Sequence, residues 1–312
     1  MTPEQAAREK TLGGIYVFAA YLLWGFLPLY FVNLAPTGPW EVVGWRVLLS
    51  LVFCVVLLAL TRGWQRLLAL LRNRRLVLWT VLAGLLIYVN WQAFLIGTLS
   101  GHVVETSLGY FINPIATVLL GVIVLHERLR IAQWIAVGIA AAAVVVIIVA
   151  VGTVPWIALT LAASFATYGL VKKKIGPAVD AVSGLTLESL WLVPIAILQL
   201  VLVGASTGLT MGQAGAGHTT LLLLAGAVTA VPLLFFAAGA RRSTLTVVGI
   251  LQFIAPIMQF LTGVLILGEP MPPERWAGFI LVWIAVAIFT VDSLLHSRRS
   301  RAAVDDGAPG PV

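Results

Sequence analysis

Long apolar runs separated by short polar stretches make up most of this chain. A helix needs about 20 apolar residues to cross the hydrocarbon of a bilayer, and these runs lack the alternation of a membrane strand. The pattern predicts ten transmembrane helices, at residues 13–33, 40–60, 75–97, 103–124, 131–150, 155–171, 181–203, 219–239, 244–267 and 275–295. The chain is therefore predicted to be an all-α membrane protein, with a polar N-terminal segment at 1–12 and a disordered polar tail at 296–312.

The chain also repeats itself at a fixed offset of 142 residues. Residues 108–127 and 250–269 are identical at nine of twenty positions without a gap, and such periodicity indicates a repeat architecture. The two copies, residues 13–150 and 155–295, contain five predicted helices each. Because five is odd, the second copy must cross the membrane in the opposite direction to the first. Inverted repeats of this kind are common in secondary transporters.

Composition and charge agree with a membrane protein and predict its orientation. The chain is 61% hydrophobic and 10% charged, whereas a soluble domain carries about 25% charged residues. All but two of the 19 lysines and arginines, Arg46 and Arg275, lie in alternate loops or at the termini. The positive-inside rule therefore places both termini in the cytoplasm, in a multi-pass protein of the inner cell membrane. The expected partners are the lipid bilayer and a small-molecule substrate, not nucleic acid; a homodimer is compatible with the sequence but not required by it.

Several segments of the chain resemble a known family. They are AYLLWGFLPLYF at 20–31, YVNWQ at 88–92, SLGYFINP at 107–114, LHERL at 125–129, TYGLVKK at 167–173, LTLESLWLVP at 185–194 and LQFIAPIMQFL at 251–261. With these segments the chain resembles the drug/metabolite transporter superfamily, whose members carry two EamA domains of five helices, and more narrowly its RarD-type members. The resemblance implies a ten-helix transporter of the cytoplasmic membrane and supplies no substrate.

Matched prolines, Pro114 and Pro256, interrupt the fourth and ninth predicted helices. A proline inside a helix removes one backbone hydrogen bond and kinks the helix, and in lipid the freed carbonyl needs another partner. Polar and small residues lie beside both prolines at helical spacing, which indicates either the wall of a cavity or close contacts between helices. On the cavity interpretation, the predicted substrate-binding residues here are Tyr110, Asn113, Thr117, Gln252 and Gln259.

The third predicted helix carries a second polar group near its middle. Tyr88, Trp91 and Gln92 share one face by their spacing, while Asn90 faces elsewhere and is a further candidate. The equivalent stretch of the second copy, residues 230–234, is apolar. A site with aromatic and amide groups on one side and aliphatic groups on the other suits an amphipathic or aromatic small molecule. The alternative is that these amides only bond neighbouring helices.

Two charged residues, Arg46 and Glu188, lie within predicted helices, where ionisable groups are costly and point to function. Their depths in the membrane differ by about 10 Å, so a direct ion pair is not expected. Arg46 is predicted either to attract an anionic group of the substrate or to reach Glu41, Glu105 or the interface. Glu188 is the predicted coupling site, because a carboxyl in a low-dielectric site can carry a proton; the alternative is a structural carboxyl.

The sequence lacks the motifs of several other functions. It contains no phosphate-binding loop, no metal-ligand spacing and no nucleophile elbow, so no cofactor, metal or catalytic residue is predicted. An intramembrane enzyme is disfavoured because the two deepest ionisable groups lie at different depths. The sequence therefore predicts a secondary transporter that exports a small amphipathic metabolite or drug-like solute, with the proton as a candidate coupling ion. A non-transporting membrane sensor on the same scaffold is the alternative.

Overall fold

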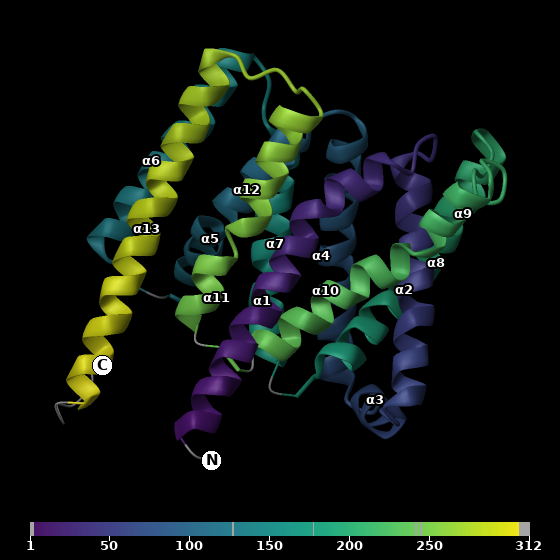
Figure 1. Cartoon of the computed structure of the whole chain (residues 1–312), viewed down its shortest axis with the longest axis horizontal. Helices are drawn as coiled ribbons and strands as arrows, with labels where there is room; N and C mark the ends of the chain where they lie inside the picture. Colours follow the sequence, from purple (N-terminus) through teal and green to yellow (C-terminus); the bar gives the residue numbers. More distant parts are fainter. Residues whose placement is uncertain (1–2, 127, 177, 241, 244, 306–312) are drawn as a thin grey trace.

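The computed structural model describes residues 3–126, 128–176, 178–240, 242–243 and 245–305, and these residues form helices without a strand. The first repeat contains α1 (Pro3–Val32), α2 (Pro39–Leu60), α3 (Trp64–Leu71), α4 (Arg74–Leu99), α5 (Val103–Leu125) and α6 (Ile131–Val151). The second contains α7 (Trp156–Ile175), α8 (Ala181–Ser206), α9 (Ala216–Leu223), α10 (Ala225–Ala240), α11 (Leu245–Leu251), α12 (Ile254–Leu261), the π-helix η1 (Thr262–Ile266) and α13 (Pro273–Asp305). Both ends of the described chain lie at the same end of the bundle, the lower end in Figure 1.

The outer surface of the bundle is apolar, as expected for a protein whose solvent is lipid. Large aliphatic side chains on several helices stay exposed, among them Leu60 (75%), Leu78 (69%) and Val149 (78%), and exposed apolar area of this extent marks a membrane or partner surface. Within the described residues, nine helical segments are long and apolar enough to span a membrane. With α7 they make up the ten predicted membrane helices.

The helices differ from the predicted spans in several places. The predicted sixth span ends at residue 171, but the helix observed there, α7, continues to Ile175 and takes three lysines into its last turn. The eighth span consists of α9 and α10, and the ninth consists of α11, α12 and η1. The short helix α3 was not predicted; it lies in the loop after α2, and two of its leucines, Leu67 and Leu70, are buried. Hydropathy alone misses such short or broken helices because it detects only length and average polarity.

The tail also differs from its expected disorder. α13 continues through the first ten residues of the segment 296–312, and residues 306–312 lie outside the described chain. The extension contains no glycine or proline before Gly307, and alanine and arginine are good helix formers. Local propensity therefore extends the helix beyond the apolar run that predicted it.

Helix contacts confirm the inverted repeat. α2 packs against its counterpart α8, and α6 packs against its counterpart α13, at the left of Figure 1. The other main contacts are exchanged between the copies: α1 packs against α10, just as α7 packs against α4. Such reciprocal contacts are those of two copies related by a two-fold axis. The interior of the bundle is thus formed between the copies rather than inside each one.

A carboxylate at the junction of α5 and η1 shows the relative direction of the repeats. Glu269, just after η1, accepts hydrogen bonds from the first two amides of α5, Val103 N at 2.5 Å and Val104 N at 2.9 Å. The start of α5 therefore lies beside the end of its counterpart, and the two run antiparallel. A carboxylate at a helix N-terminus satisfies unpaired amides and the helix dipole.

Glu269→Ala is therefore expected to destabilise the protein by about 1–2 kcal/mol, through loss of this helix cap. Thermal unfolding of the purified protein measures the effect. Glu274→Ala is the matched control, because Glu274 lies exposed in the first turn of α13 and its loss is expected to cost no more than about 0.5 kcal/mol. Equal effects of the two substitutions would show that Glu269 does not stabilise α5.

Candidate functional site

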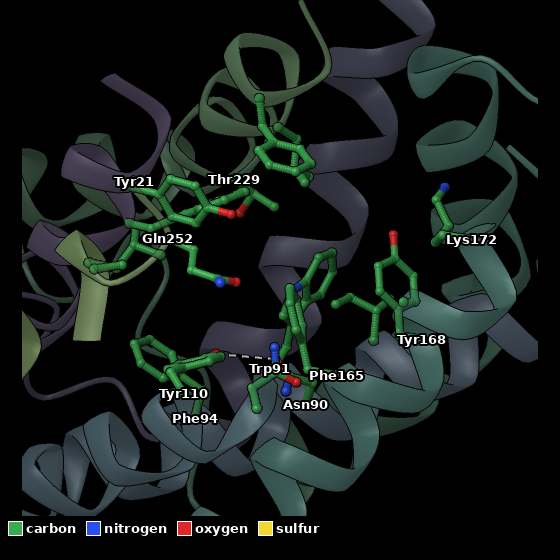
Figure 2. A pocket seen from close by; sticks show the side chains of 18 of the residues that line it. Tyr21, Asn90, Trp91, Phe94, Tyr110, Phe165, Tyr168, Lys172, Thr229 and Gln252 are labelled. Carbon is green, nitrogen blue, oxygen red and sulfur yellow. Dashed lines mark hydrogen bonds between the residues drawn. The ribbon is translucent and has the colours of Figure 1, made fainter. Parts of the chain in front are cut away.

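A cavity of about 520 Å³ lies between the two repeats. Its walls are largely aromatic and are formed by Tyr21, Trp24, Trp91, Phe94, Tyr110, Phe165, Tyr168 and Phe236. Its polar lining groups belong to Arg46, Asn90, Asn113, Lys172, Thr229, Gln252 and Gln259. Figure 2 shows these walls in part, with Tyr21 and Gln252 on one side of the open space and Tyr168 and Lys172 on the other. A mostly apolar pocket with a few polar groups has the character of a small-molecule site.

The helix α4 presents one stripe of side chains to the cavity. On α4 the stripe is Ile87, Asn90, Trp91 and Phe94, which is the i, i+3, i+4, i+7 spacing of a single helix face. The expectation that Asn90 faces elsewhere is therefore wrong. Asn90 Oδ1 accepts a hydrogen bond from Tyr110 of α5 at 3.2 Å, the dashed line in Figure 2. Its Nδ2 donates to Ser164 of α7, so Asn90 joins three helices at the cavity wall.

Three residues that were predicted to contact the substrate, Tyr88, Gln92 and Thr117, are not among those that line the cavity. Tyr88 OH donates to Gln199 Oε1 at 2.6 Å, and Gln199 Nε2 donates to Gln92 Oε1 at 3.0 Å. These two α4 residues therefore bond α8, as in the alternative interpretation. Thr117 is exposed and donates to the Asn113 carbonyl. Helical spacing finds residues that share a face, but α4 packs against both α7 and α8 and also borders the cavity, so spacing alone does not tell which covered face borders the cavity.

The matched prolines lie in different surroundings. α5 is continuous across Pro114, whereas α11 ends before residue 252 and α12 begins two residues before Pro256. At this break Phe253 N donates to Ile250 O, at 3.4 Å, instead of Gly249 O. The freed Gly249 carbonyl accepts from Gln252 Nε2 at 2.9 Å, which satisfies it without water. Gln252, Pro256 and Gln259 line the cavity from this interrupted helix, as predicted, while Pro114 does not.

Arg46 extends from α2 into the interior of the bundle and is only 4% exposed. Its Nε donates to Thr229 of α10 at 2.8 Å. The guanidinium carbon lies 4.3 Å from the centre of the Trp91 ring and 5.3 Å from that of Phe31, which is within the range of cation–π attraction. Arg46 Nη1 is buried and has no hydrogen-bond partner among the described residues.

Arg46 does not form the outward contacts that its sequence position suggested. Glu41 instead accepts from the backbone amides of Thr210 and Met211 in the loop after α8. Glu105 accepts from Ile157 N at 3.0 Å at the start of α7. Both carboxylates satisfy backbone amides that have no acceptor within their own helix or loop. The interpretation of Arg46 as a residue that reaches Glu41, Glu105 or the interface is therefore wrong.

Glu188 on α8 is 1% exposed and forms an ion pair across to α7. Lys172 Nζ donates to its Oε1 at 2.7 Å, and Tyr168 OH donates to its Oε2 at 3.0 Å. As expected, Glu188 does not pair with Arg46. Both partners on α7 also line the cavity, so the pair links the coupling candidate to the substrate space. Sequence reasoning missed Lys172 because it placed the three consecutive lysines in a loop; the signal was the spacing of Tyr168 and Lys172 along one helix face.

The start of α8, two turns before Glu188, is held by a helix cap. Asp180 accepts from Ser183 N at 3.1 Å. Burial by itself would raise the pKa of the Asp180 carboxyl, but the hydrogen bonds from Ser183 and Val182 and the nearby Arg66 outweigh burial and lower it. A charged cap at this end matches the positive end of the helix dipole.

Equivalent positions of the two repeats line the same cavity. Trp91 on α4 corresponds to Leu233 on α10 at the 142-residue offset, and Trp24 on α1 corresponds to Tyr168 on α7 at an offset of 144. The walls are thus alike in position but different in chemistry. Substrate sites at the interface of two inverted repeats are typical of secondary transporters.

Comparisons with known proteins agree with this architecture. A profile of the EamA-like transporter family matches residues 11–149. Protein RarD of Streptomyces exfoliatus is 47% identical over 307 residues, which cover 98% of this chain and 96% of that protein. Protein RarD of Escherichia coli K12 is 39% identical and covers 94% of this chain and 99% of its own length. A Bacillus subtilis protein named "Uncharacterized transporter YojE" is 39% identical over 94% of this chain and 98% of its own length.

One solved crystal structure shares the fold, with a TM-score of 0.55 and 19% sequence identity over 90% of this chain and 97% of its own. The identities to the full-length relatives are high enough, and their coverage is complete enough, to establish the relationship. The chain belongs to the EamA-like transporter family, as one of its RarD-type members, and is a multi-pass membrane transporter.

Proposed function

We propose that this protein is a secondary active transporter that carries a small amphipathic solute through the cavity by alternating access, with net export. The observation that carries the proposal is the cavity itself, which lies between inverted repeats and combines aromatic walls with a few polar groups. Unpaired buried acceptors at its wall, Asn113 Oδ1 and Gln259 Oε1, would be satisfied by donor groups of a bound solute. The export direction rests on the resemblance to drug/metabolite transporters.

The two helices that carry the matched prolines, Pro114 and Pro256, support alternating access. α5 is continuous, while its counterpart is broken between α11 and α12 and continues into a π-helix. Near-equivalent sequences thus adopt two conformations in one molecule. If the repeats exchange these conformations, the cavity opens toward the opposite side of the membrane, which is the rocking-repeat mechanism. Breaks and π-bulges in helices are common at functional sites of this kind.

The coupling site in this proposal is the Lys172–Glu188 pair. A carboxylate that is 1% exposed is stable in its charged form only while it is paired. Protonation of Glu188 would break the pair with the Lys172 ammonium at the cavity wall. A proton taken up on one side of the membrane and released on the other would then change the charge and shape of the substrate space.

Leu233→Trp is expected to abolish solute flux without unfolding the protein. Leu233 lines the same cavity as its counterpart Trp91, so a second indole would occupy space that the solute needs. Candidate solutes come from an untargeted metabolite comparison of cells with and without the protein, and flux is measured in proteoliposomes.

Leu233→Met is the control for that substitution, because it nearly conserves volume and costs under about 1.5 kcal/mol. Wild-type flux through the tryptophan variant would show that solute does not pass through this cavity. Absence of flux by the wild-type protein for every metabolite that the comparison finds would instead favour a membrane sensor.

A further inference from the structure

Arg46 brings a positive charge to the cavity that no group of the described residues neutralises. Lys172, the other cation in the lining, is neutralised by Glu188. No aspartate or glutamate is among the residues that line the cavity, and no ion pair of Arg46 exists among the described residues. An unpaired charge taken out of water costs several kcal/mol, so the site is incomplete without a negative partner.

The contacts of the Arg46 guanidinium limit which chemical groups can act as this negative partner. One guanidinium nitrogen is held by Thr229 at 2.8 Å, and the cation lies over the Trp91 ring at 4.3 Å. These contacts orient the guanidinium but supply no full negative charge, because a ring face and a hydroxyl are only partial acceptors. Nη1 is left as a buried donor without an acceptor. Its complement is an oxyanion, since guanidinium groups bind carboxylates with short, charge-assisted hydrogen bonds.

The aromatic wall of the cavity restricts the part of the solute that does not contact Arg46. Trp91, Phe94 and Tyr110 lie next to one another on the wall formed by α4 and α5, and the Phe94 and Tyr110 rings are 6.0 Å apart at a tilted angle. Aromatic walls of this kind favour stacked or edge-on contacts with another ring. We infer that the transported solute is an organic anion, an aromatic carboxylate whose carboxylate binds Arg46 Nη1 and whose ring contacts the aromatic wall. This inference rests on the proposed transport function and names its substrate class.

Binding of matched acids and amides tests the inference directly. Benzoate, phenylacetate and indole-3-acetate are each compared with the corresponding neutral amide, by thermal stabilisation of the purified full-length protein. At least one acid is expected to stabilise the wild-type protein at concentrations at least about tenfold lower than its amide, and Arg46→Gln is expected to remove this difference. Arg46→Lys should keep part of it. Arg275→Gln, which changes an arginine outside the cavity whose Nη1 bonds the Pro270 carbonyl, should leave it intact.

Equal stabilisation by acid and amide, stabilisation by none of the probes, or an unchanged preference in Arg46→Gln would overturn the inference. An untargeted metabolite comparison separates this outcome from failure of the transport function. Cells that carry the wild type, Arg46→Gln or no copy are compared for solutes whose distribution depends on the wild-type protein. Aromatic carboxylates are expected among them. If the solutes are neutral or cationic, only the substrate class is wrong; if no solute depends on the protein, the transport function itself fails.

Discussion

Gly226→Val is expected to prevent recovery of the folded protein, with a loss of stability above about 3 kcal/mol. Gly226 on α10 faces the backbone of α2, and a Cβ atom at this position would overlap the Leu49 carbonyl group. A backbone carbonyl cannot rotate away as a side chain can, so α2 and α10 would have to separate. Without a hydrophobic force between helices in lipid, close van der Waals contact at small residues is what holds them together. Size-exclusion profile and thermal unfolding in detergent measure the effect.

Gly138→Val is the matched control for this prediction. Gly138 also lies within a membrane helix, α6, but it is exposed and a Cβ there would meet nothing within 4 Å. Because valine has a better helix propensity than glycine, this variant should be as stable as the wild type or slightly more stable. If both variants behave alike, close packing of α10 on α2 does not limit stability.

Lys172→Met is expected to destabilise the protein by up to about 3 kcal/mol, more than Glu188→Gln does. Removing the ammonium leaves a carboxylate that is 1% exposed, and the Tyr168 hydroxyl is then its remaining hydrogen-bond donor among the described residues. Removing the carboxylate leaves an ammonium on a side chain that is 30% exposed, which water can still reach. The double variant Lys172→Met with Glu188→Gln should recover most of the loss, because no unpaired charge remains. Thermal unfolding of the four proteins gives the coupling free energy of the pair.

The same variants test the role of the pair in coupling. Glu188→Gln is expected to fold and to keep solute exchange down its own gradient, but to lose flux driven by a pH gradient across proteoliposomes. Lys174→Met is the control, because Lys174 is exposed and its ammonium lies 4.5 Å from the ring centre of Trp79 rather than near Glu188. Unchanged gradient-driven flux in Glu188→Gln would show that the proton travels by another route.

Much of the fold was predictable because membrane helices leave strong local signals. Nine segments met the requirement of length and apolarity, and the repeat predicted the antiparallel copies. The matched glycines Gly84 and Gly226 are a more specific case. A Cβ on Gly84 would lie 3.0 Å from the Glu188 carbonyl oxygen on α8, and Gly226 has the equivalent contact with α2. Their repetition in the sequence marks positions where a helix of one copy touches the backbone of the other.

The candidate site was only partly predictable. The sequence identified several residues of the site correctly. Each of the following was predicted and lines the cavity: Arg46, Trp91, Tyr110, Gln252 and Gln259. Most of their partners could not be predicted, since Arg46, Tyr110 and Gln259 bond residues 183, 20 and 235 positions away in the chain. Tyr88 and Gln92 looked equivalent to Trp91 by spacing, yet they bond Gln199 on α8. Apart from an exposed apolar stripe that includes Leu78 and Val89, α4 has several sides covered by protein, and spacing does not show which of them borders the cavity.

By itself the sequence determined the membrane environment, the number of long helices, the two inverted copies and the presence of buried charges. These properties follow from hydropathy, charge and period, which are local or strictly repeated along the chain. Only the tertiary structure decided which charges are neutralised. It placed Lys172 beside Glu188 and turned Glu41 and Glu105 to backbone amides, so that within the described part of the chain Arg46 has no carboxylate partner. Pairing in a low-dielectric interior depends on distances between helices, and those distances are set by packing between the two copies rather than by any segment alone.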